Sequence, residues 1–342
     1  MMNKIDTIIK EDVQKIINSV DFRILENKSI LVTGASGLLG TYFIACLDSV
    51  ANSKYPPRRI VATIQSELPS HLSNIESDGR IEFCRGDLTE NDFLDQLEQF
   101  DFIIHAAGYG QPGKFMDNKL KTIMLNTSTT ISLFDHLNKN GHFLFLSTSE
   151  VYSGSLRSPF SEEEIGTTNT THPRSCYIEA KRCGEAICNV QRENGIATSS
   201  ARLALAYGPG TRRDDKRVIN SFIQRAILES KISLQDLGTA VRTYCYITDA
   251  IEILFNILFR GKHPIYNVGG KSRTSIENLA NCIAEHVGVS VHLPDSEFSI
   301  IGSPDDVHLN MTLAEQEFGK KEYVGLVEGL TRTIEWQKIL YN

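Results

Sequence analysis

The chain has 342 residues, and its 35 lysines and arginines against 42 aspartates and glutamates give a formal net charge of −7. Hydrophobic residues make up 41% and charged residues 23% of the chain, as in ordinary soluble globular proteins. These proportions exclude a disordered chain, a collagen-like repeat and a disulfide scaffold, and the negative charge argues against a nucleic-acid polymer as partner. At about 150 residues per domain, the length corresponds to a little over two domains.

The cysteines and the apolar stretches indicate the cellular compartment of the protein. The seven cysteines are irregularly spaced and include no CxxC pair, so neither a disulfide framework nor a zinc site is expected, and we predict no bound metal. The longest apolar stretch, around Ile251–Phe259, is interrupted by Glu252 and Asn256 and is too short to span a membrane. Charged residues also interrupt the N-terminus, which argues against a signal peptide. We therefore expect a cytoplasmic protein without a membrane partner.

Residues 1–27 are predicted to form a helical extension of the main fold. Their apolar residues recur at helical spacing, at Ile9, Val13, Ile16, Ile17 and Val20. We expect this helix to pack on its own domain rather than to bind a partner.

From Lys28 onwards, strand and helix patterns alternate. Strands are predicted at 30–33, 59–64, 81–85, 102–106 and 142–147, and helices at 38–50, 92–100 and 119–137. Near-continuous apolar strands separated by helices are typical of a parallel sheet that is covered on both faces. The sequence therefore predicts an α/β fold with a doubly wound Rossmann sheet in a domain spanning 28–209.

The second half of the chain is less regular. A strand is predicted at 198–206, and a polar segment at 211–217 follows the Gly-Pro-Gly sequence at 208–210. We expect a smaller, mainly substrate-binding lobe at 210–342, with a strand at 265–268 and a closing amphipathic helix at 327–340.

A glycine-rich turn follows the first strand and opens the first helix of the sheet domain. Glycines spaced three apart in TGASGLLG at 33–40 permit a tight turn, a close approach to a pyrophosphate and close helix–sheet packing. The alternative is a glycine-rich turn without a ligand. We predict that a dinucleotide contacts Gly34, Ser36, Gly37, Leu38, Leu39 and Gly40.

The sequence offers no acidic ligand for the adenosine ribose directly after the second strand. Gln65, Ser66 and Glu67 follow the strand at 59–64, so no aspartate stands at its end and no arginine there suggests an NADP phosphate pocket. NAD is therefore the predicted cofactor. Asp87, with Leu88 beside it, follows the next strand and is placed to contact the adenine edge; alternatively, Asp87 caps the following helix.

Two further groups of residues suggest acid–base chemistry. Tyr177 and Lys181 are four residues apart on one helix face, where the ammonium can lower the phenol pKa and produce a base near neutral pH. Thr148, Ser149 and Glu150 follow the strand at 142–147, at the sheet edge where parallel sheets bind ligands. The alternatives are an exposed helix pair for the first group and a turn with a helix cap for the second.

Together these motifs resemble the extended short-chain dehydrogenase/reductase family, the NAD-dependent epimerases and dehydratases that modify nucleotide sugars. The resemblance rests on the glycine loop, HAAG at 105–108, STSEVY at 147–152, YIEAK at 177–181 and YGPG at 207–210. PRSCYIEAKRCGE at 173–185 and VRTYCYITDA at 241–250 resemble UDP-glucuronate decarboxylases most closely. The family resemblance implies that the chain re-enters the sheet domain near 240–270, and that it forms a homodimer through a helix bundle.

The resemblance also implies roles for individual residues. Tyr177 is the expected base, Lys181 its partner on the nicotinamide ribose, and Thr148 a hydrogen-bond partner of the sugar hydroxyl that is oxidised. Ser149 and Glu150 stand where members of the family differ in reaction type. Expected substrate ligands are Arg217 and Arg242, and further expected cofactor contacts are Ala106, Ala107 and Gly108.

The implied reaction begins with oxidation of the sugar at C4 by NAD⁺. Loss of CO₂ from a sugar acid and return of the hydride is the leading expectation, ahead of a 4,6-dehydratase and then a 4-epimerase or 4-dehydrogenase. A non-catalytic NAD sensor is disfavoured, because a sensor has no physical need for Thr148, Tyr177 and Lys181 together. Two departures from the decarboxylase pattern, Leu205 in place of asparagine and the sequence of 105–112, point to an unusual nucleotide or sugar.

Overall fold

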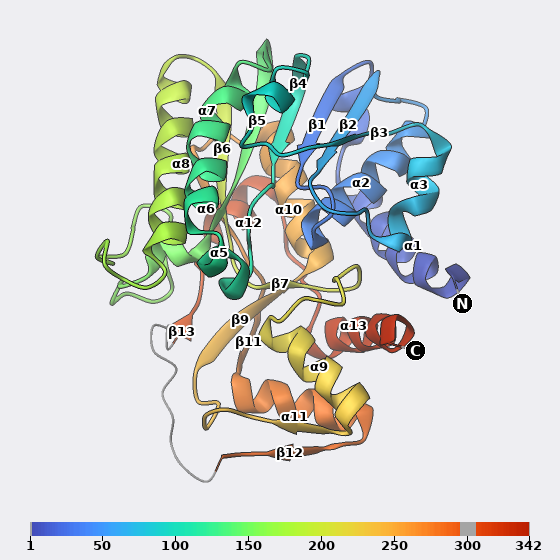
Figure 1. Cartoon of the computed structure of the whole chain (residues 1–342), viewed down its shortest axis with the longest axis vertical. Helices are drawn as coiled ribbons and strands as arrows, with labels where there is room; N and C mark the ends of the chain where they lie inside the picture. Colours follow the sequence, from blue (N-terminus) through green and yellow to red (C-terminus); the bar gives the residue numbers. More distant parts are fainter. Residues whose placement is uncertain (1, 295–305, 342) are drawn as a thin grey trace.

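A computed structural model describes residues 2–294 and 306–341. Seven parallel strands form the main sheet in the order β10-β6-β5-β4-β1-β2-β3 (Figure 1). The strands are β1 Ser29–Thr33, β2 Arg59–Ile64, β3 Glu82–Arg85, β4 Phe100–His105, β5 Leu137–Thr148, β6 Ala197–Leu203 and β10 Ile265–Val268. This topology confirms the predicted doubly wound α/β sheet.

Helices cover both faces of the sheet. Successive residues of β1 alternate between two apolar clusters: Ile30 and Val32 pack with one set of helices, and Leu31 packs with the other. The first set is α1 Met2–Ser19, α2 Leu38–Ala51 and α10 Ile247–Arg260, and the second is α6 Lys119–Asn126, α7 Ser128–Phe134 and α8 Ser175–Glu193. Short helices α3 Ser73–Asp78, α4 Asn91–Leu94 and α5 Pro112–Asp117 connect these elements.

Three predicted elements are divided or end early in the structure. The helix predicted at 92–100 is only the single turn α4, because Phe100 already belongs to β4. The helix predicted at 119–137 divides at Thr127 into α6 and α7, and Leu137 begins β5. The strand predicted at 198–206 breaks after Leu203, since Leu205 adopts the left-handed conformation with φ +41°.

The chain after Leu205 builds a smaller sheet beside the main one. Strand β9 pairs in parallel with β7 and β13 and antiparallel with β11. These strands are β7 Ala206–Tyr207, β9 Val241–Tyr246, β11 Ser272–Ser275 and β13 Asp306–Val307. The remaining elements of this part are α9 Val218–Glu229, β8 Lys231–Ser233, α11 Ile276–Val287, β12 Ser290–His292, α12 Thr312–Phe318 and α13 Leu326–Tyr341. Strand β10 meanwhile returns to the main sheet beside β6.

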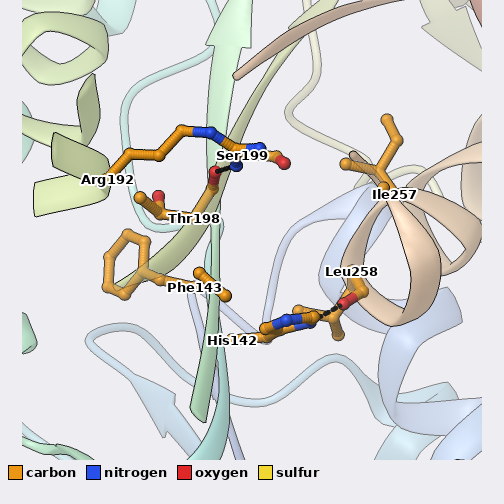
Figure 2. Close-up of a pocket in the computed structure, with 9 residues that line it drawn as sticks. His142, Phe143, Arg192, Thr198, Ser199, Ile257 and Leu258 are labelled. Carbon is orange, nitrogen blue, oxygen red and sulfur yellow. Dashed lines mark hydrogen bonds between the residues drawn. The ribbon is translucent and has the colours of Figure 1, made fainter. Parts of the chain in front are cut away.

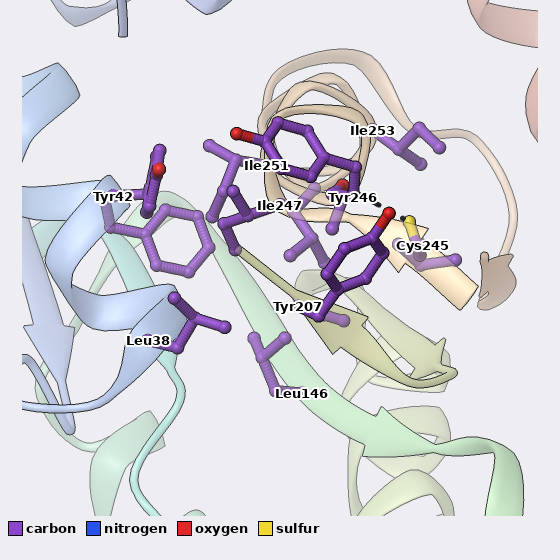
Figure 3. Close-up of a cluster of buried hydrophobic side chains, with 14 of the residues drawn as sticks. Leu38, Tyr42, Leu146, Tyr207, Cys245, Tyr246, Ile247, Ile251 and Ile253 are labelled. Carbon is purple, nitrogen blue, oxygen red and sulfur yellow. Dashed lines mark hydrogen bonds between the residues drawn. The ribbon is translucent and has the colours of Figure 1, made fainter. Parts of the chain in front are cut away.

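A continuous apolar cluster joins the two sheets. Figure 3 shows Leu38 and Tyr42 of α2 facing Ile247 and Ile251 of α10, with Tyr207 of the smaller sheet beside them. All five side chains are at least nine-tenths buried. The start of α2, which carries the end of the glycine loop, is therefore fixed against both parts of the chain.

Helix α1 is fastened to this core by a buried carboxylate. Asp12 accepts hydrogen bonds from the hydroxyls of Tyr42 at 2.8 Å and Tyr246 at 2.7 Å, and it pairs with Arg332 of α13 at 2.9 Å. Burial raises the pKa of Asp12, although Arg332 and the two tyrosines oppose that shift. The N-terminal helix therefore packs on its own chain, as predicted, and links α2 to the C-terminal helix.

Among residues 2–294 and 306–341, no helix combines the length and the apolar character needed to cross a membrane. The seven cysteines are all free thiols.

Replacing Asp12 by alanine is expected to lower the free energy of unfolding by about 3 kcal/mol or more, because two buried tyrosine hydroxyls would lose their acceptor and Arg332 would lose its buried ion-pair partner. Urea denaturation measures this change. Glu11→Ala is the matched control: Glu11 also pairs with Arg332, at 3.0 Å, but its side chain is 56% exposed, so the expected loss is less than about 1 kcal/mol. Equal losses in the two variants would contradict the role assigned to Asp12.

Buried His105 makes the stability depend on pH. Its ring nitrogens lie 2.8 Å from the Thr33 hydroxyl and 2.8 Å from the Leu125 carbonyl oxygen, and burial lowers its pKa to about 4. An unfolded histidine binds a proton near pH 6.5, so the folded chain binds fewer protons between these values. The contribution of neutral His105 to the free energy of unfolding is expected to be fully present above pH 6.5. It is expected to be lost as the pH decreases towards 4.

Urea denaturation at pH 7.5, 6.0 and 5.0 tests this dependence. The variant His105→Gln is expected to show a shallower loss of stability on acidification, since glutamine does not titrate. Exposed His286, replaced in the same way, serves as control and is expected to leave the slope unchanged. An unaltered slope in His105→Gln would count against this origin of the pH dependence.

Candidate active site

A cavity of about 510 Å³ opens at the carboxyl ends of the main-sheet strands, which is the volume range of small-molecule sites. The glycine loop and the segments after β2, β3 and β4 form one side, and the segment after β7 forms the other. The predicted cofactor residues on its wall are Gly34, Ser36, Gly37, Leu38, Leu39, Gly40, Asp87, Leu88, Ala106, Ala107 and Gly108.

A second cavity, of about 20 Å³, lies at the opposite edge of the sheet. His142 and Phe143 of β5, Thr198 and Ser199 of β6, and α10 surround it (Figure 2). It has room for about one water molecule. The cavity at the carboxyl ends is therefore the candidate site.

The glycine loop fits a dinucleotide pyrophosphate. Gly34 has φ +70°, and a Cβ atom there would lie 2.7 Å from the Ala107 Cα, so a side chain would collide with the segment after β4. Gly37 is the N-cap of α2 and supplies no capping side chain, which leaves amide donors of the first turn available to an anion. These features match the requirements of the predicted NAD site.

Asp87 is engaged on both carboxylate oxygens. One oxygen accepts the Thr89 amide at 3.0 Å and its hydroxyl at 2.8 Å, and the other accepts Gln65 at 2.9 Å and the ammonium of Lys121. Partial burial raises the pKa of Asp87, but the hydrogen bonds from Lys121 and Thr89 more than offset this and lower it. Asp87 thus caps a turn and lines the cavity at once, and its contact with adenine stays a prediction.

Tyr177 and Lys181 lie together on the inner face of α8, both buried. The Tyr177 ring stacks on Phe115 of α5, with centroids 4.5 Å apart and planes 2° from parallel. The Lys181 ammonium donates to the Leu146 carbonyl at 2.5 Å and lies 5.9 Å from the centre of the Tyr177 ring. A Cβ added at Gly108 would lie 3.9 Å from this ammonium, so Lys181 sits just behind the cavity wall.

The electrostatics of this pair differ from the prediction. Burial and the nearby Glu150 carboxylate raise the pKa of Tyr177 to about 12, although a hydrogen bond with Thr148 and the charges of Arg174 and Arg217 oppose the shift. Burial lowers the pKa of Lys181 to about 7. The expected lowering of the phenol pKa by Lys181 is therefore wrong for this geometry, because the ammonium bonds to a backbone carbonyl rather than to the phenol.

Thr148 ends β5 and caps the short helix η3, Ser149–Tyr152, by accepting the Glu150 amide at 3.3 Å. The Glu150 carboxylate pairs with the guanidinium of Arg174, which directly precedes α8. Burial raises the pKa of Glu150 despite this cation. The turn-and-cap alternative is thus present for Thr148, yet the same turn brings Glu150 close enough to Tyr177 to shift its pKa.

The two predicted substrate arginines lie in different places. Arg217 lines the cavity and is paired with Asp215 at 2.6 Å. Arg242 lies on β9, is buried, and donates to the Val241 carbonyl at 2.8 Å. It is absent from the described cavity wall, so the structure brings only Arg217 to the cavity.

Arg174 and Phe115 are among the residues of the site that were not predicted from sequence. Arg174 stands three positions before Tyr177, where a cation can neutralise an acid at the strand end, so its position carried a usable signal. Phe115 is fully buried and covers the Tyr177 ring, but it belongs to a helix of only six residues without a periodic pattern. No spacing rule points from Phe115 to Tyr177, because the two residues meet only in the folded chain.

Several known proteins are similar to this chain. UDP-glucuronic acid decarboxylase 6 of Arabidopsis thaliana is 29% identical over 310 residues, which cover 89% of this chain and 87% of that protein. UDP-glucuronic acid decarboxylase 1 of Xenopus tropicalis is 28% identical over 320 residues, covering 91% of this chain and 72% of that protein.

Solved structures share the fold. The dTDP-glucose 4,6-dehydratase DesIV of Streptomyces venezuelae, solved with NAD, superposes with a TM-score of 0.79 at 22% identity and covers 91% of this chain and 97% of its own. A UDP-glucuronic acid 4-epimerase variant of Bacillus cereus, solved with NAD and a UDP-sugar acid analogue, has a TM-score of 0.77 at 25% identity, with coverages of 92% and 100%.

The model of the NAD dependent epimerase/dehydratase family matches residues 30–269, which contain the glycine loop, the end of β5 and helix α8. The chain belongs to the NAD dependent epimerase/dehydratase family.

Proposed function

We propose that this chain is an NAD-dependent decarboxylase of a nucleotide-sugar acid, with Tyr177, Lys181, Thr148, Ser149 and Glu150 at its active site. The observation that carries the proposal is the burial of Thr148, Tyr177 and Lys181 together beside the cavity, next to the Glu150–Arg174 pair. The relatives named UDP-glucuronic acid decarboxylase support the choice of a sugar acid as substrate.

The chain's own residues prepare the C4 hydroxyl of the sugar. Tyr177 in its phenolate form takes the hydroxyl proton, and Thr148 orients the hydroxyl by a hydrogen bond. Lys181 is proposed to hold the ribose next to the nicotinamide. NAD⁺, when bound at the glycine loop, would supply an acceptor for the C4 hydride and a donor for its return, so that no net oxidation would occur.

A keto group at C4 makes the C6 carboxylate part of a β-keto acid. The bond between C5 and C6 then breaks, CO₂ leaves, and its bonding electrons form an enolate that is reprotonated at C5. This step needs no acid on a leaving oxygen. Ser149 is a poor proton donor, so its presence favours loss of CO₂ over loss of water.

Arg174 supports an acidic substrate. Its guanidinium neutralises Glu150, which otherwise would repel a carboxylate in the site. The Arg174 Nε atom is buried and has no hydrogen-bond partner among the described residues, so one donor is left for an anionic group. Arg217 lines the cavity and is proposed to bind the diphosphate. Arg242 is proposed to reach the substrate from β9.

The chain from residue 28 onwards divides into two proposed parts. We assign cofactor binding to 28–209, including the return of the chain near 240–270, and substrate binding mainly to 210–342. Residues 1–27 form the helical extension. Seven free cysteines accord with the proposed cytoplasmic location, where thiols stay reduced.

A homodimer is proposed through helices α6, α7 and α8, which stand together at one side of the sheet (Figure 1). Their outer faces expose large apolar side chains that a monomer would leave in water. The exposed residues are Leu120, Ile123, Met124, Ile131 and Val190, of which Leu120 is 78% and Val190 is 55% exposed.

Purified chain incubated with UDP-, GDP- and dTDP-sugars, with and without a C6 carboxylate, is expected to release CO₂ from a sugar acid and from nothing else. Mass spectrometry and ¹³CO₂ detection from substrate labelled at C6 identify the product. A stable 4-keto-6-deoxy product from a neutral sugar would replace the proposal by a 4,6-dehydratase. An epimerised sugar acid that retains its carboxylate would replace it by a 4-epimerase.

Tyr177→Phe is expected to lower kcat by about 100-fold or more, because proton transfer by a placed base contributes on that scale. Cofactor binding, measured by isothermal titration, is expected to persist, since the ring still stacks on Phe115. Tyr55→Phe is a control of the same chemistry, as Tyr55 lies in the segment before β2 and does not line the described cavity. Unchanged turnover in Tyr177→Phe would favour the non-catalytic sensor.

Leu120→Glu combined with Val190→Glu is expected to convert the dimer into a monomer, because two charges would be buried in the proposed interface. Sedimentation velocity measures the change. Val327→Glu on α13 is the control: Val327 is 70% exposed but lies outside the helices α6, α7 and α8, so this variant is expected to stay dimeric. A monomeric wild type would refute the proposed assembly.

A further inference from the structure

At the end of β2 the cavity wall carries a cation, although no lysine or arginine closely follows this strand in the sequence. Arg212 follows β7 in the chain, yet its Nη1 atom donates to the Ser66 hydroxyl at 3.1 Å and lies 3.5 Å from the Glu67 carbonyl oxygen. Ser66 is the second residue after β2. The fold therefore brings a guanidinium from 146 residues downstream to the end of that strand.

The Ser66 hydroxyl also lies 3.2 Å from the hydroxyl of Ser36, in the glycine loop. Ser36, Ser66 and Arg212 all line the large cavity, so two hydroxyls and a guanidinium converge on one part of its wall. In Rossmann folds the residue at the end of this strand meets the 2′-position of the adenosine ribose: a carboxylate there selects NAD, and a nearby arginine accommodates the 2′-phosphate of NADP.

The charges around Arg212 leave room for such a phosphate. Asp214 pairs with Arg212 at 3.3 Å but also with Lys114 at 2.8 Å, so two cations share one carboxylate. The Arg212 side chain is 34% exposed, which keeps its donors accessible from the cavity. Gln65, directly after β2, is neutral and turned to Asp87, while Glu67 is exposed.

We propose that Arg212, with the hydroxyls of Ser36 and Ser66, forms a binding site for an adenosine 2′-phosphate, so that the chain takes NADP(H) as well as NAD(H). The inference rests on placing the dinucleotide in this cavity but not on the reaction that follows. A guanidinium and two hydroxyls offer the charge-assisted hydrogen bonds that a phosphate dianion requires.

Isothermal titration of the full chain with 2′,5′-ADP and with 5′-ADP tests the site directly. The two nucleotides share the cavity contacts and differ only in the 2′-phosphate. The wild type is expected to bind 2′,5′-ADP at least tenfold more tightly than 5′-ADP. Arg212→Ala is expected to abolish this difference while leaving 5′-ADP binding within twofold. Equal binding of the two nucleotides by the wild type would overturn the proposal.

Arg213→Ala is the matched control, because the neighbouring guanidinium lies 5.5 Å from the centre of the Tyr341 ring and not on the cavity wall. It is expected to keep the preference for 2′,5′-ADP. Ser66→Asp is expected to reverse that preference, since a carboxylate accepts a ribose hydroxyl but repels a phosphate. Thermal melting confirms that each variant folds. Equal weakening of both nucleotides in Arg212→Ala would assign Arg212 to general packing and refute the site.

A competition experiment extends the test to whole cofactors. The purified chain is equilibrated with equal concentrations of NAD⁺ and NADP⁺, and bound dinucleotide is quantified by mass spectrometry after gel filtration. The wild type is expected to retain bound NADP⁺. Arg212→Ala is expected to retain at least tenfold less. Absence of NADP⁺ from the wild type, with NAD⁺ bound, would refute the proposal and leave the proposed reaction intact.

Discussion

The geometry of the candidate active site depends on a buried ion pair between Arg202 of β6 and Glu185 of α8, 2.8 Å apart. The Ser147 hydroxyl donates to the same carboxylate at 2.5 Å, which fixes the end of β5 against α8. Arg202 also donates to Tyr152 at 2.9 Å, and Tyr152 donates to Asn267 of β10 at 2.7 Å. Because a buried charge without its partner is costly, these contacts hold three strands and the helix in one register.

This arrangement buries Thr148, Tyr177 and Lys181, so that a charge on any of them needs a partner. Burial raises the pKa of Tyr177 and lowers that of Lys181, so it disfavours the charged form of both side chains. An anionic substrate can enter such a buried site only if nearby cations offset its charge. Arg217 and Arg174 are already paired with carboxylates, so a diphosphate or a sugar acid must compete for them. Such an exchange favours ligands whose anionic groups match the arginine positions, which couples affinity to specificity.

The parts of the fold that follow local rules could be predicted from sequence. The strand at 265–268 and the helix starting at Leu38 have the predicted residues, because apolar periodicity and a glycine turn mark them. Tertiary contacts, which depend on how distant segments pack in the folded chain, could not be predicted. Arg212 reaches Ser66 only through the fold, and Lys181 bonds to Leu146 rather than to the phenol, which spacing on a helix does not reveal.

The reaction cycle and the adenosine site bear on each other. In the proposed reaction the hydride taken from C4 is returned to the same substrate, so the cofactor is neither consumed nor regenerated by another enzyme. The cellular ratio of oxidised to reduced cofactor then matters little, and no redox demand separates NAD from NADP. The choice between NAD and NADP then depends on the contacts that the chain makes with the adenosine end of the cofactor. Gln65 and Ser66 stand at the end of β2 in place of a carboxylate, and Arg212 donates to Ser66. These contacts are therefore compatible with a 2′-phosphate on the adenosine ribose.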